Sequence, residues 1–375
     1  MTPLSRIRTR ATCTAILFAL LASPGATPAQ QKSLPPEKRA AIDKSVSGFM
    51  AANSVPGISA AVVLQGELAW SAGYGMADLE NYVPATSATL FRLGSISKPL
   101  TATAALQLVD RGKLDLDAPV QKYCSAFPQK DSPITTRELL GHLGGIRHYN
   151  KDGKGDIPED SARHFATMQE SLQVFANDPL VAKPGTKFNY STYGYTLVGC
   201  VIEGASAQKF TDYAAENVFR SAAMDHTQAD DFFAVIPHRS RWYHKDETGA
   251  VRNAGVLDSS YKIPGGGFIS SADDLARFAA ALLADKLVTR KSRDLMWTAQ
   301  KLVDGSPTRY GLGWFIVTEH QIQLIAHTGS QQGASTALVL IPDRQAAVVV
   351  LINMDGVDAA KLCDNILKIV FDLKD

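Results

Sequence analysis

Three serine–lysine pairs in this 375-residue chain have the spacing Ser-x-x-Lys: Ser95/Lys98, Ser206/Lys209 and Ser259/Lys262. A serine hydroxyl becomes a nucleophile when a neighbouring base accepts its proton, and an uncharged lysine can be that base. Residues three apart share one face of a helix, so this spacing can bring the amine to the hydroxyl. The spacing alone is a weak signal, and the surroundings of each pair must decide between them.

The surroundings favour Ser95 and Lys98. Ser95 follows FRLG and begins a long helical pattern, in which Pro99 falls in the first turn, where proline is tolerated. A helix N-terminus directs N–H groups and positive partial charge at the hydroxyl, which favours a neutral lysine as base. The alternative is that Ser95 only caps the helix beside a solvated lysine. Ser206 is expected at the end of a helix, and Ser259 in a loop with no helix following.

Other catalytic patterns are absent from the sequence. It contains no HExxH, CxxC, GxGxxG or Walker loop, and no serine has glycine at both i−2 and i+2. The eight histidines show no metal-ligand spacing. The sequence therefore predicts no metal site and no cofactor.

The two ends of the chain predict the sheet that must position these residues. Apolar runs such as AVVVLI are typical of strands covered on both faces. We expect a helix over 36–53 and another over 357–373. The expected strands are 58–64, 67–75, 310–317, 322–329, 337–342 and 346–353.

The middle of the chain predicts mostly helix and loop. The expected helices are 95–111, 135–141, 193–204, 210–218 and 271–283, the last with a capping-box spacing at Ser271 and Asp274. We therefore predict an α+β fold, with an antiparallel sheet from both chain ends, flanked by helices, and an inserted, mainly helical lobe. The predicted domain is 30–375, divided into a sheet lobe (36–90 plus 301–375) and a helical lobe (91–300). A cleft between the lobes is the expected site.

The first 29 residues have the order of a secretory signal peptide. Arg6, Arg8 and Arg10 precede an apolar run over 15–22, and small residues follow up to Ala29. The alternative, a membrane anchor, would need a longer run than about a dozen apolar residues. We therefore expect a periplasmic or secreted protein with no stable membrane span after cleavage.

The amino-acid composition bears on two questions: whether the protein binds nucleic acid and whether it needs disulfide bonds. Lys plus Arg number 38 and Asp plus Glu 37, which gives no support to a nucleic-acid-binding surface. Cleavage after Ala29 would leave a net charge of −2 and remove Cys13. Three cysteines would remain, so at least one must be free or pair between chains. A core of this size makes disulfide bridges unnecessary, and we expect none to be needed.

Six blocks of sequence, in order, resemble the serine β-lactamase-like hydrolases, a superfamily that includes class C β-lactamases, DD-peptidases and related esterases. The blocks span most of the mature chain, and LLGHLGGIRHYNKD and FNYSTYGYTL are especially similar to the mitochondrial-type serine β-lactamase-like proteins and their bacterial relatives. The six blocks are FRLGSISKPLTATAALQLVDRGKLDLD, ITTRELLGHLGGIRHY, FNYSTYGYTLVG, PGGGFISSADDLARF, YGLGW and HTGSQQGASTALVLIPD.

The resemblance implies a role for three residues. Ser95 resembles the acylated serine, Lys98 the amine that helps deprotonate it, and Tyr190 the tyrosine of the Tyr-x-Asn element, which shuttles protons to the leaving group. We expect Tyr190 to serve as a base only if Lys98 and the helix end favour its anion. The third position of that element is Thr192, where Asn is usual. This departure puts in doubt the binding of a substrate's acylamide side chain at this position.

His327, Thr328 and Gly329 stand where many relatives carry Lys-Thr-Gly. The resemblance implies that the N–H groups of Ser330 and Ser95 form the oxyanion hole and that the backbone after the strand can pair with an extended substrate. We hypothesise that His327 orients the Tyr190 network and, when protonated, weakly attracts a substrate carboxylate.

Three further residues and one glycine segment have more modest interpretations. His142 is expected to be structural, bonding loop backbone. Arg147 and His148 could line the cleft or lie in a solvated loop. Gly265–Gly267 resemble a family turn beside the site and could equally serve tight backbone geometry.

Two classes of function follow. The first is an exported serine hydrolase that forms a Ser95 acyl-enzyme with a small-molecule or peptide substrate, which could be a peptide, amide, ester or β-lactam. The second is a catalytically silent protein of the same fold that binds cell-wall fragments or assembles with itself. The sequence leaves the substrate, the acyl acceptor and the oligomeric state open.

Overall fold

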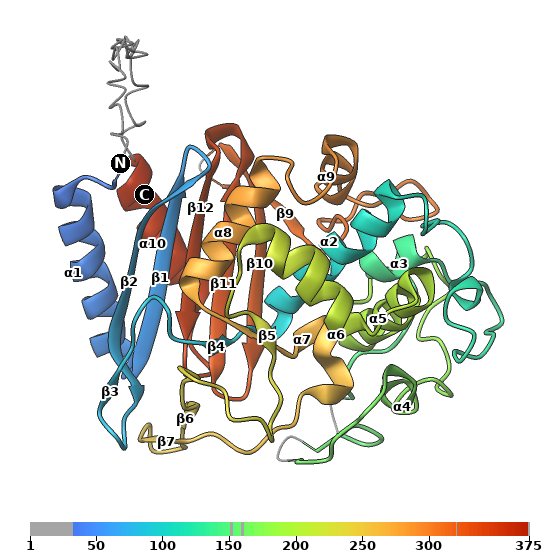
Figure 1. Cartoon of the computed structure of the whole chain (residues 1–375), viewed down its shortest axis with the longest axis horizontal. Coiled ribbons are helices and arrows are strands. Elements are labelled where there is room, and N and C mark those ends of the chain that lie inside the picture. Colours follow the sequence, from blue (N-terminus) through green and yellow to red (C-terminus); the bar gives the residue numbers. More distant parts are fainter. Residues whose placement is uncertain (1–32, 151–152, 159–160, 320, 374–375) are drawn as a thin grey trace, which may run out of the picture. The chain divides into compact units, whose positions relative to one another are not determined.

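Strands from both ends of the chain meet in one antiparallel sheet, shown in Figure 1. The computed structural model describes residues 33–150, 153–158, 161–319 and 321–373, so the predicted signal peptide lies outside the described residues. Within the described part, seven strands follow the order β3-β2-β1-β12-β11-β10-β9. Their bounds are β1 Gly57–Leu64, β2 Glu67–Asp78, β3 Val83–Pro84, β9 Phe315–Glu319, β10 Ile322–Gln331, β11 Ala334–Ile341 and β12 Ala346–Ile352.

The centre of the sheet is the pair β1 and β12, in which Ala60 lies opposite Val350. Every residue of β12 is buried, which confirms the prediction of strands covered on both faces. The β1–β2 connection turns at Gln65 and Gly66, both with positive φ, a combination that fits the twist of a two-residue hairpin.

Helices cover the two faces of this sheet. On one face α8 (Ala272–Leu283) packs against β1, β2 and β12, and on the other α10 (Ala359–Phe371) packs against β11, β12 and α1 (Pro36–Asn53) (Figure 1). Ser271 caps α8 by accepting a hydrogen bond from the Asp274 N–H. The Asp274 side chain does not complete the predicted capping box. Its carboxylate instead accepts a hydrogen bond from Thr227 Oγ1 and pairs with Arg277.

The middle of the chain supplies helices, as predicted, and also short strands that the sequence did not predict. Its helices are α2 Ser97–Asp110, α3 Thr136–Leu140, α4 Met168–Leu172, α5 Thr192–Ser206, α6 Phe210–Tyr213, α7 Ile263–Gly266 and α9 Arg290–Met296. Its strands are β4 Phe91–Arg92, β5 Gln228–Ala229, β6 Tyr243–Lys245, β7 Val251–Asn253 and β8 Phe268–Ser270. Together these elements confirm the α+β fold class. The division into two lobes at residues 91 and 300 stays a prediction.

Two local predictions were wrong. The strand expected over 310–317 begins only at Phe315, because Gly313 adopts positive φ and the Gly311 N–H bonds back to the Trp314 carbonyl. The helix expected over 210–218 is present, but only Phe210–Tyr213 is α-helical and Ala214–Phe219 is a π-helix. Ser259 is followed by two short helical turns, where no helix was expected.

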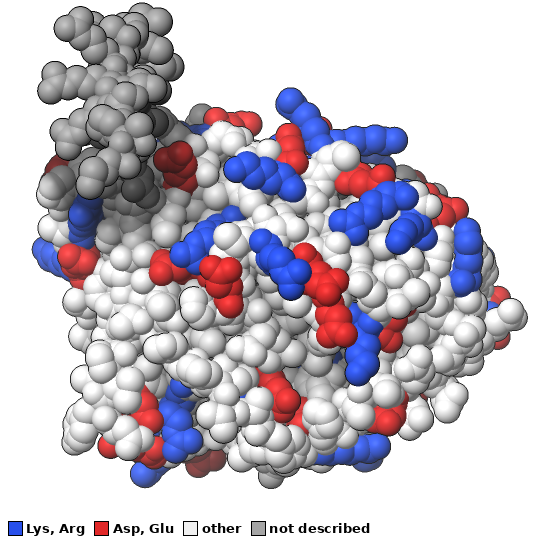
Figure 2. All heavy atoms as spheres, viewed as in Figure 1, with Lys and Arg blue, Asp and Glu red and all other residues white. Residues whose placement is uncertain are grey.

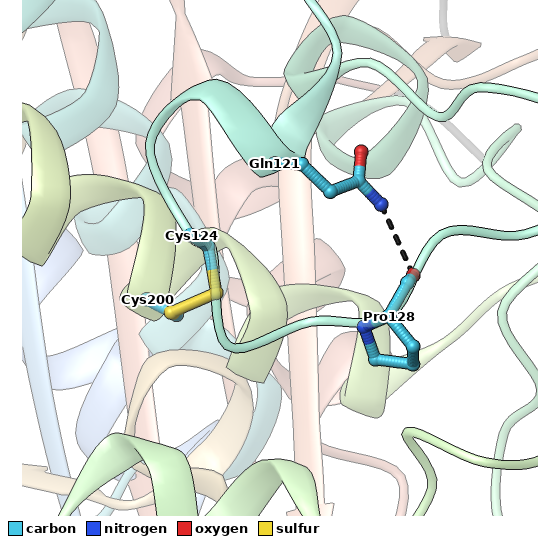
Figure 3. The surroundings of a disulfide bond; sticks show 4 residues. All are labelled: Gln121, Cys124, Pro128 and Cys200. Atoms are coloured by element: carbon cyan, nitrogen blue, oxygen red, sulfur yellow. Dashed lines mark hydrogen bonds between the residues drawn. A yellow bond between two sulfur atoms is a disulfide. The ribbon is translucent and has the colours of Figure 1, made fainter.

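The prediction that no disulfide is needed was also wrong. Cys124 and Cys200 form a disulfide between the loop after the 3-10 turn Val120–Lys122 and the middle of α5 (Figure 3). Cys363 is buried and not part of a disulfide, as the odd number of remaining cysteines requires. The bridge links α5, which begins at Thr192, to a segment 76 residues earlier in the chain.

Removing this bridge should destabilise the fold. The double substitution Cys124→Ala with Cys200→Ala is expected to lower the free energy of unfolding by about 2–5 kcal/mol, because the unfolded chain regains the freedom that the bridge removes. Urea unfolding with and without reductant measures the loss. The matched control is Cys363→Ala, which keeps the bridge and should lose stability in reductant as the parent does, whereas the double variant should be insensitive to reductant. Equal reductant sensitivity of the double variant and the parent would contradict the bridge.

On the face seen in Figure 2, basic and acidic side chains are intermixed, and broad uncharged areas lie between them. None of the helices within the described ranges combines the length and the apolar content that crossing a bilayer requires.

Candidate active site

Ser95 lies in a 3-10 turn, Gly94–Ile96, that leads directly into α2. Gly94 has φ +51, and a Cβ built on it would lie 2.8 Å from the Ser330 nitrogen. A Cβ on Gly329 would lie 2.0 Å from the Leu93 carbonyl oxygen and 3.0 Å from the Ser95 nitrogen. Glycine at both positions therefore lets β10 lie directly against the turn that carries the serine.

Lys98 is fully buried one turn along, and its amine makes three polar contacts. Lys98 Nζ lies 3.0 Å from Ser95 Oγ, 3.1 Å from Thr192 Oγ1 and 2.7 Å from the Gly265 carbonyl oxygen. Burial and, second, the charge of Lys262 lower the pKa of Lys98 well below its ordinary value. Both effects favour the neutral form of the amine.

A neutral amine has two N–H donors and one lone pair, and the three contacts match this inventory. The Gly265 carbonyl can only accept, and Thr192 Oγ1 can accept the second N–H, which leaves the lone pair for Ser95 Oγ when the amine is neutral. The arrangement fits a base that accepts the serine proton. The structure confirms the predicted approach of the Lys98 amine to the Ser95 hydroxyl. It also shows that Thr192 is a hydrogen-bond partner of Lys98.

Tyr190 completes the group, because its ring centre lies 4.7 Å from Lys98 Nζ and its hydroxyl interacts with the Ser95 side chain. Burial raises the pKa of Tyr190 above its ordinary value, so the phenol stays protonated. The condition for a basic Tyr190, an anion favoured by a nearby charge, is not met. The geometry instead suits Tyr190 as a proton donor to a leaving group.

The predicted oxyanion donors come together at the contact between the turn and β10. Ser330 lies on β10 beyond Ala326, where pairing with β9 ends. Ser95 lies in the first turn of a helix, where N–H groups lack intrahelical partners. The strand edge from Thr328 onward is therefore unpaired by β9 and available to an extended substrate.

His327 does not take the predicted role. It is 2% exposed, and its ring accepts from the Tyr310 hydroxyl at Nε2 (2.9 Å) and donates from Nδ1 to the Thr328 carbonyl (2.6 Å). Burial lowers the pKa of His327 to about 3, so the ring is neutral near pH 7 and offers no charge to a substrate carboxylate. The prediction that its charge varies near neutral pH was wrong, and its direct partner is Tyr310 rather than Tyr190.

The substitution His327→Gln tests this account of the histidine. We expect kcat to fall by about tenfold, the cost of roughly one hydrogen bond that holds the Thr328–Ser330 backbone. The shape of the pH profile between pH 5 and 8 should not change, because a group with a pKa of about 3 does not titrate in that range. Loss of an ionisation in that range in the variant, seen in kcat/KM against pH, would contradict a neutral His327.

Of the remaining predicted residues, some line the cavity and others only stabilise the structure around it. His142 Nδ1 accepts from the Ser191 N–H, which confirms a structural role. Arg147 pairs with Asp156 and does not line the cavity. His148 does line it, and its Nδ1 accepts from the Thr192 N–H. Thr328 is exposed and lines a separate, smaller hollow beside α10, so its side chain is not among those around Ser95.

A cavity of about 800 Å³ opens in front of Ser95. Thr192, Gly265 and Ser330 line it, together with residues that the sequence interpretation missed, among them Tyr149, Tyr261 and Lys262. Lys262 belongs to a Ser-x-x-Lys pair set aside for lack of a following helix. The Gly265 carbonyl, which holds Lys98, left no signal in the sequence because it is a backbone group.

Comparison with known proteins identifies the family of the chain. The profile of the family described as "Beta-lactamase" matches residues 42–371. The human serine beta-lactamase-like protein LACTB, mitochondrial, is 32% identical over 379 residues, which cover 77% of this chain and 69% of that protein. Penicillin-binding protein 4* of Bacillus subtilis is 26% identical, over 77% of this chain and 66% of that protein.

A solved structure is similar to this chain in fold. The octameric penicillin-binding protein homologue from Pyrococcus abyssi superposes with a TM-score of 0.77 at 25% identity, covering 90% of this chain and 78% of that one.

Proposed function

The chain belongs to the beta-lactamase family of serine hydrolases, and from that premise we propose that it cleaves a peptide, amide or ester through an acyl-enzyme on Ser95. The observation that carries the proposal is the buried Lys98 amine, which lies 3.0 Å from Ser95 Oγ and is held by the Gly265 carbonyl. A β-lactam is a possible substrate or trap, because its strained amide reacts with the same nucleophile.

The proposed reaction follows from the positions of the groups. Ser95 Oγ forms a bond to the acyl carbon while its proton passes to Lys98, and the carbonyl oxygen takes the negative charge toward the Ser95 and Ser330 N–H groups. The bond to the leaving group then breaks, and that group takes the proton of Lys98 through the Tyr190 hydroxyl. Water or an amine attacks the ester in the reverse sense and frees the serine.

The nature of the substrate stays open among the members of this class. Thr192 holds Lys98, so its hydroxyl has less capacity for an acylamide side chain than the usual asparagine would have. The neutral His327 supplies no fixed cation next to the nucleophile. Both features argue against efficient turnover of penicillins and favour a peptide, amide or ester.

Labelling with a fluorophosphonate separates this function from a silent binding protein. We expect stoichiometric labelling that maps to Ser95 and disappears in Ser95→Ala. Folded protein that labels at no serine would overturn the proposal and favour the silent protein. The preformed contacts of Ser95, Lys98 and Tyr190 support the enzyme, since a binder needs no such set.

We also propose that the protein is exported. The signal-peptide pattern up to Ala29 supports this, and so does the Cys124–Cys200 disulfide, because such bonds persist in oxidising compartments. The mass of the mature protein from a cell envelope fraction tests it. Removal of about the first 29 residues is the expected result, and an intact N-terminus in the cytoplasm would contradict it.

A further inference from the structure

His142 occupies a backbone position that usually belongs to glycine. It follows α3 and has φ +60. The Leu143 N–H bonds to the Glu138 carbonyl (2.7 Å) and the His142 N–H to the Leu139 carbonyl (3.2 Å), which together form a Schellman motif at the end of the helix. Glycine is the most frequent residue at this place in the motif, because a Cβ is strained at positive φ. The turn itself gives no reason for a histidine, so the reason must lie in the contacts of this residue.

Those contacts surround Tyr190. The His142 carbonyl accepts a hydrogen bond from the Asn189 N–H (2.8 Å), and His142 Nδ1 accepts one from the Ser191 N–H (3.1 Å). The imidazole ring packs against the Tyr190 ring, with the two ring centres 4.2 Å apart. One residue, itself 2% exposed, therefore holds the backbone on both sides of Tyr190 and the phenol ring as well.

The imidazole is neutral, and the Ser191 N–H determines its tautomer. Burial is the main cause that lowers the pKa of His142 well below its ordinary value. Because Nδ1 accepts, the proton is on Nε2, which has no hydrogen-bond partner among the described residues. A buried N–H without a partner is costly, and a phenyl ring would avoid that cost. The acceptor at Nδ1 is thus the property that favours histidine over another ring here.

Ser191 connects His142 to the start of α5. The Ser191 hydroxyl accepts a hydrogen bond from the Gly194 N–H (2.9 Å) and caps this helix, which begins at Thr192. The bond from the Ser191 N–H to His142 therefore fixes the entry of the chain into α5 immediately after Tyr190. Without that bond, the segment that carries the phenol is held less firmly.

We propose that His142 is a positioning residue, which holds the Tyr190 hydroxyl where it protonates the leaving group. The inference rests on the proposed acyl-enzyme function and adds a residue to it. When the bond between the acyl carbon and the leaving oxygen breaks, that oxygen takes the Tyr190 proton, and Tyr190 takes the proton that Lys98 received from Ser95. His142 exchanges no proton in these steps.

Two esters with the same acyl group test this proposal: p-nitrophenyl butyrate, whose leaving group departs as a stable anion, and ethyl butyrate, whose leaving group needs a proton. The ratio of kcat/KM for the ethyl ester to that for the p-nitrophenyl ester measures proton delivery. We expect His142→Gly, which suits positive φ but offers no acceptor, to lower this ratio about tenfold or more. His142→Asn should keep the ratio within about threefold, because its side-chain oxygen can accept from the Ser191 N–H and asparagine tolerates positive φ.

Three further variants show whether the effect acts through Tyr190. His142→Phe fills the space that glycine leaves but has no acceptor, so it should lower the ratio as His142→Gly does, and it serves if the glycine variant does not fold. In a Tyr190→Phe background, His142→Gly should change the ratio no further. Thr135→Ala removes the cap at the other end of α3, so it should lower the thermal stability and leave the ratio unchanged.

The outcomes separate this inference from the proposed function. A native ratio in folded His142→Gly and His142→Phe, an equal fall in Thr135→Ala, or a further fall in the Tyr190→Phe background would overturn the inference. A native protein that is acylated by the p-nitrophenyl ester alone would also overturn it, because Tyr190 would then not protonate a leaving group. If neither ester places a butyryl group on Ser95, the proposed function fails, and this inference fails with it.

Discussion

Replacement of Lys98 with methionine is expected to lower kcat/KM by about 10³-fold or more for every substrate of the enzyme, whether ester or amide. Methionine keeps the length and the apolar stem of the side chain but has no lone pair to accept the Ser95 proton. Because Lys98 is fully buried and its neighbours are already placed, the loss should appear in the chemical step rather than in substrate binding.

The pH dependence of kcat/KM in the native protein should show the same role of Lys98 as a base. Lys98 acts in its unprotonated form, so kcat/KM should fall as the pH drops through the lowered pKa of the amine, and this limb should lie well below the pH at which an ordinary lysine titrates. Steady-state rates from pH 4 to 9 measure this limb, with circular dichroism to confirm that Lys98→Met is folded. Retention of activity within tenfold in folded Lys98→Met would show that another group removes the proton.

Removal of the nucleophile should have an effect at least as large. Ser95→Ala is expected to reduce hydrolysis by about 10⁴-fold or more, because the covalent route is lost and only binding and the oxyanion donors remain. The matched control is Ser259→Ala, which changes the serine of another Ser-x-x-Lys pair. Ser259 is fully buried and its hydroxyl has no hydrogen-bond partner among the described residues.

The two serine variants are compared by kcat and by thermal unfolding. Ser259→Ala should keep its rate within a few-fold, since no step of the proposed reaction uses that hydroxyl. Equal loss of rate in both variants, without unfolding, would mean that the wrong serine has been assigned.

The sequence carried enough information to predict the sheet and the nucleophile segment. The alternation and apolar runs of both chain ends predict β1, β10, β11 and β12 within a few residues, because strands buried on both faces have a composition that loops do not share. The Ser95/Lys98 pair could be chosen from three because a helix follows it directly. Each of these signals is local in the chain.

The features that sequence reasoning missed depend on contacts between distant segments. The Gly265 carbonyl holds Lys98 across a separation of 167 residues, and it is a backbone group with no side chain to reveal it. The neutral state of His327 follows from burial against Tyr310, which no pattern of residue types discloses. Lys262 was set aside because two short helical turns after Ser259 were read as loop.

The central claim is that an acyl group rests on Ser95 during turnover. Acid quench of the protein during the first turnovers of an aryl ester, followed by peptide mapping, measures this directly. We predict an added mass equal to the acyl group on the peptide that contains Ser95, formed in a burst and lost at the steady-state rate. Rapid hydrolysis of the ester with no acyl group on that peptide, or with the acyl group on a different residue, would contradict the account.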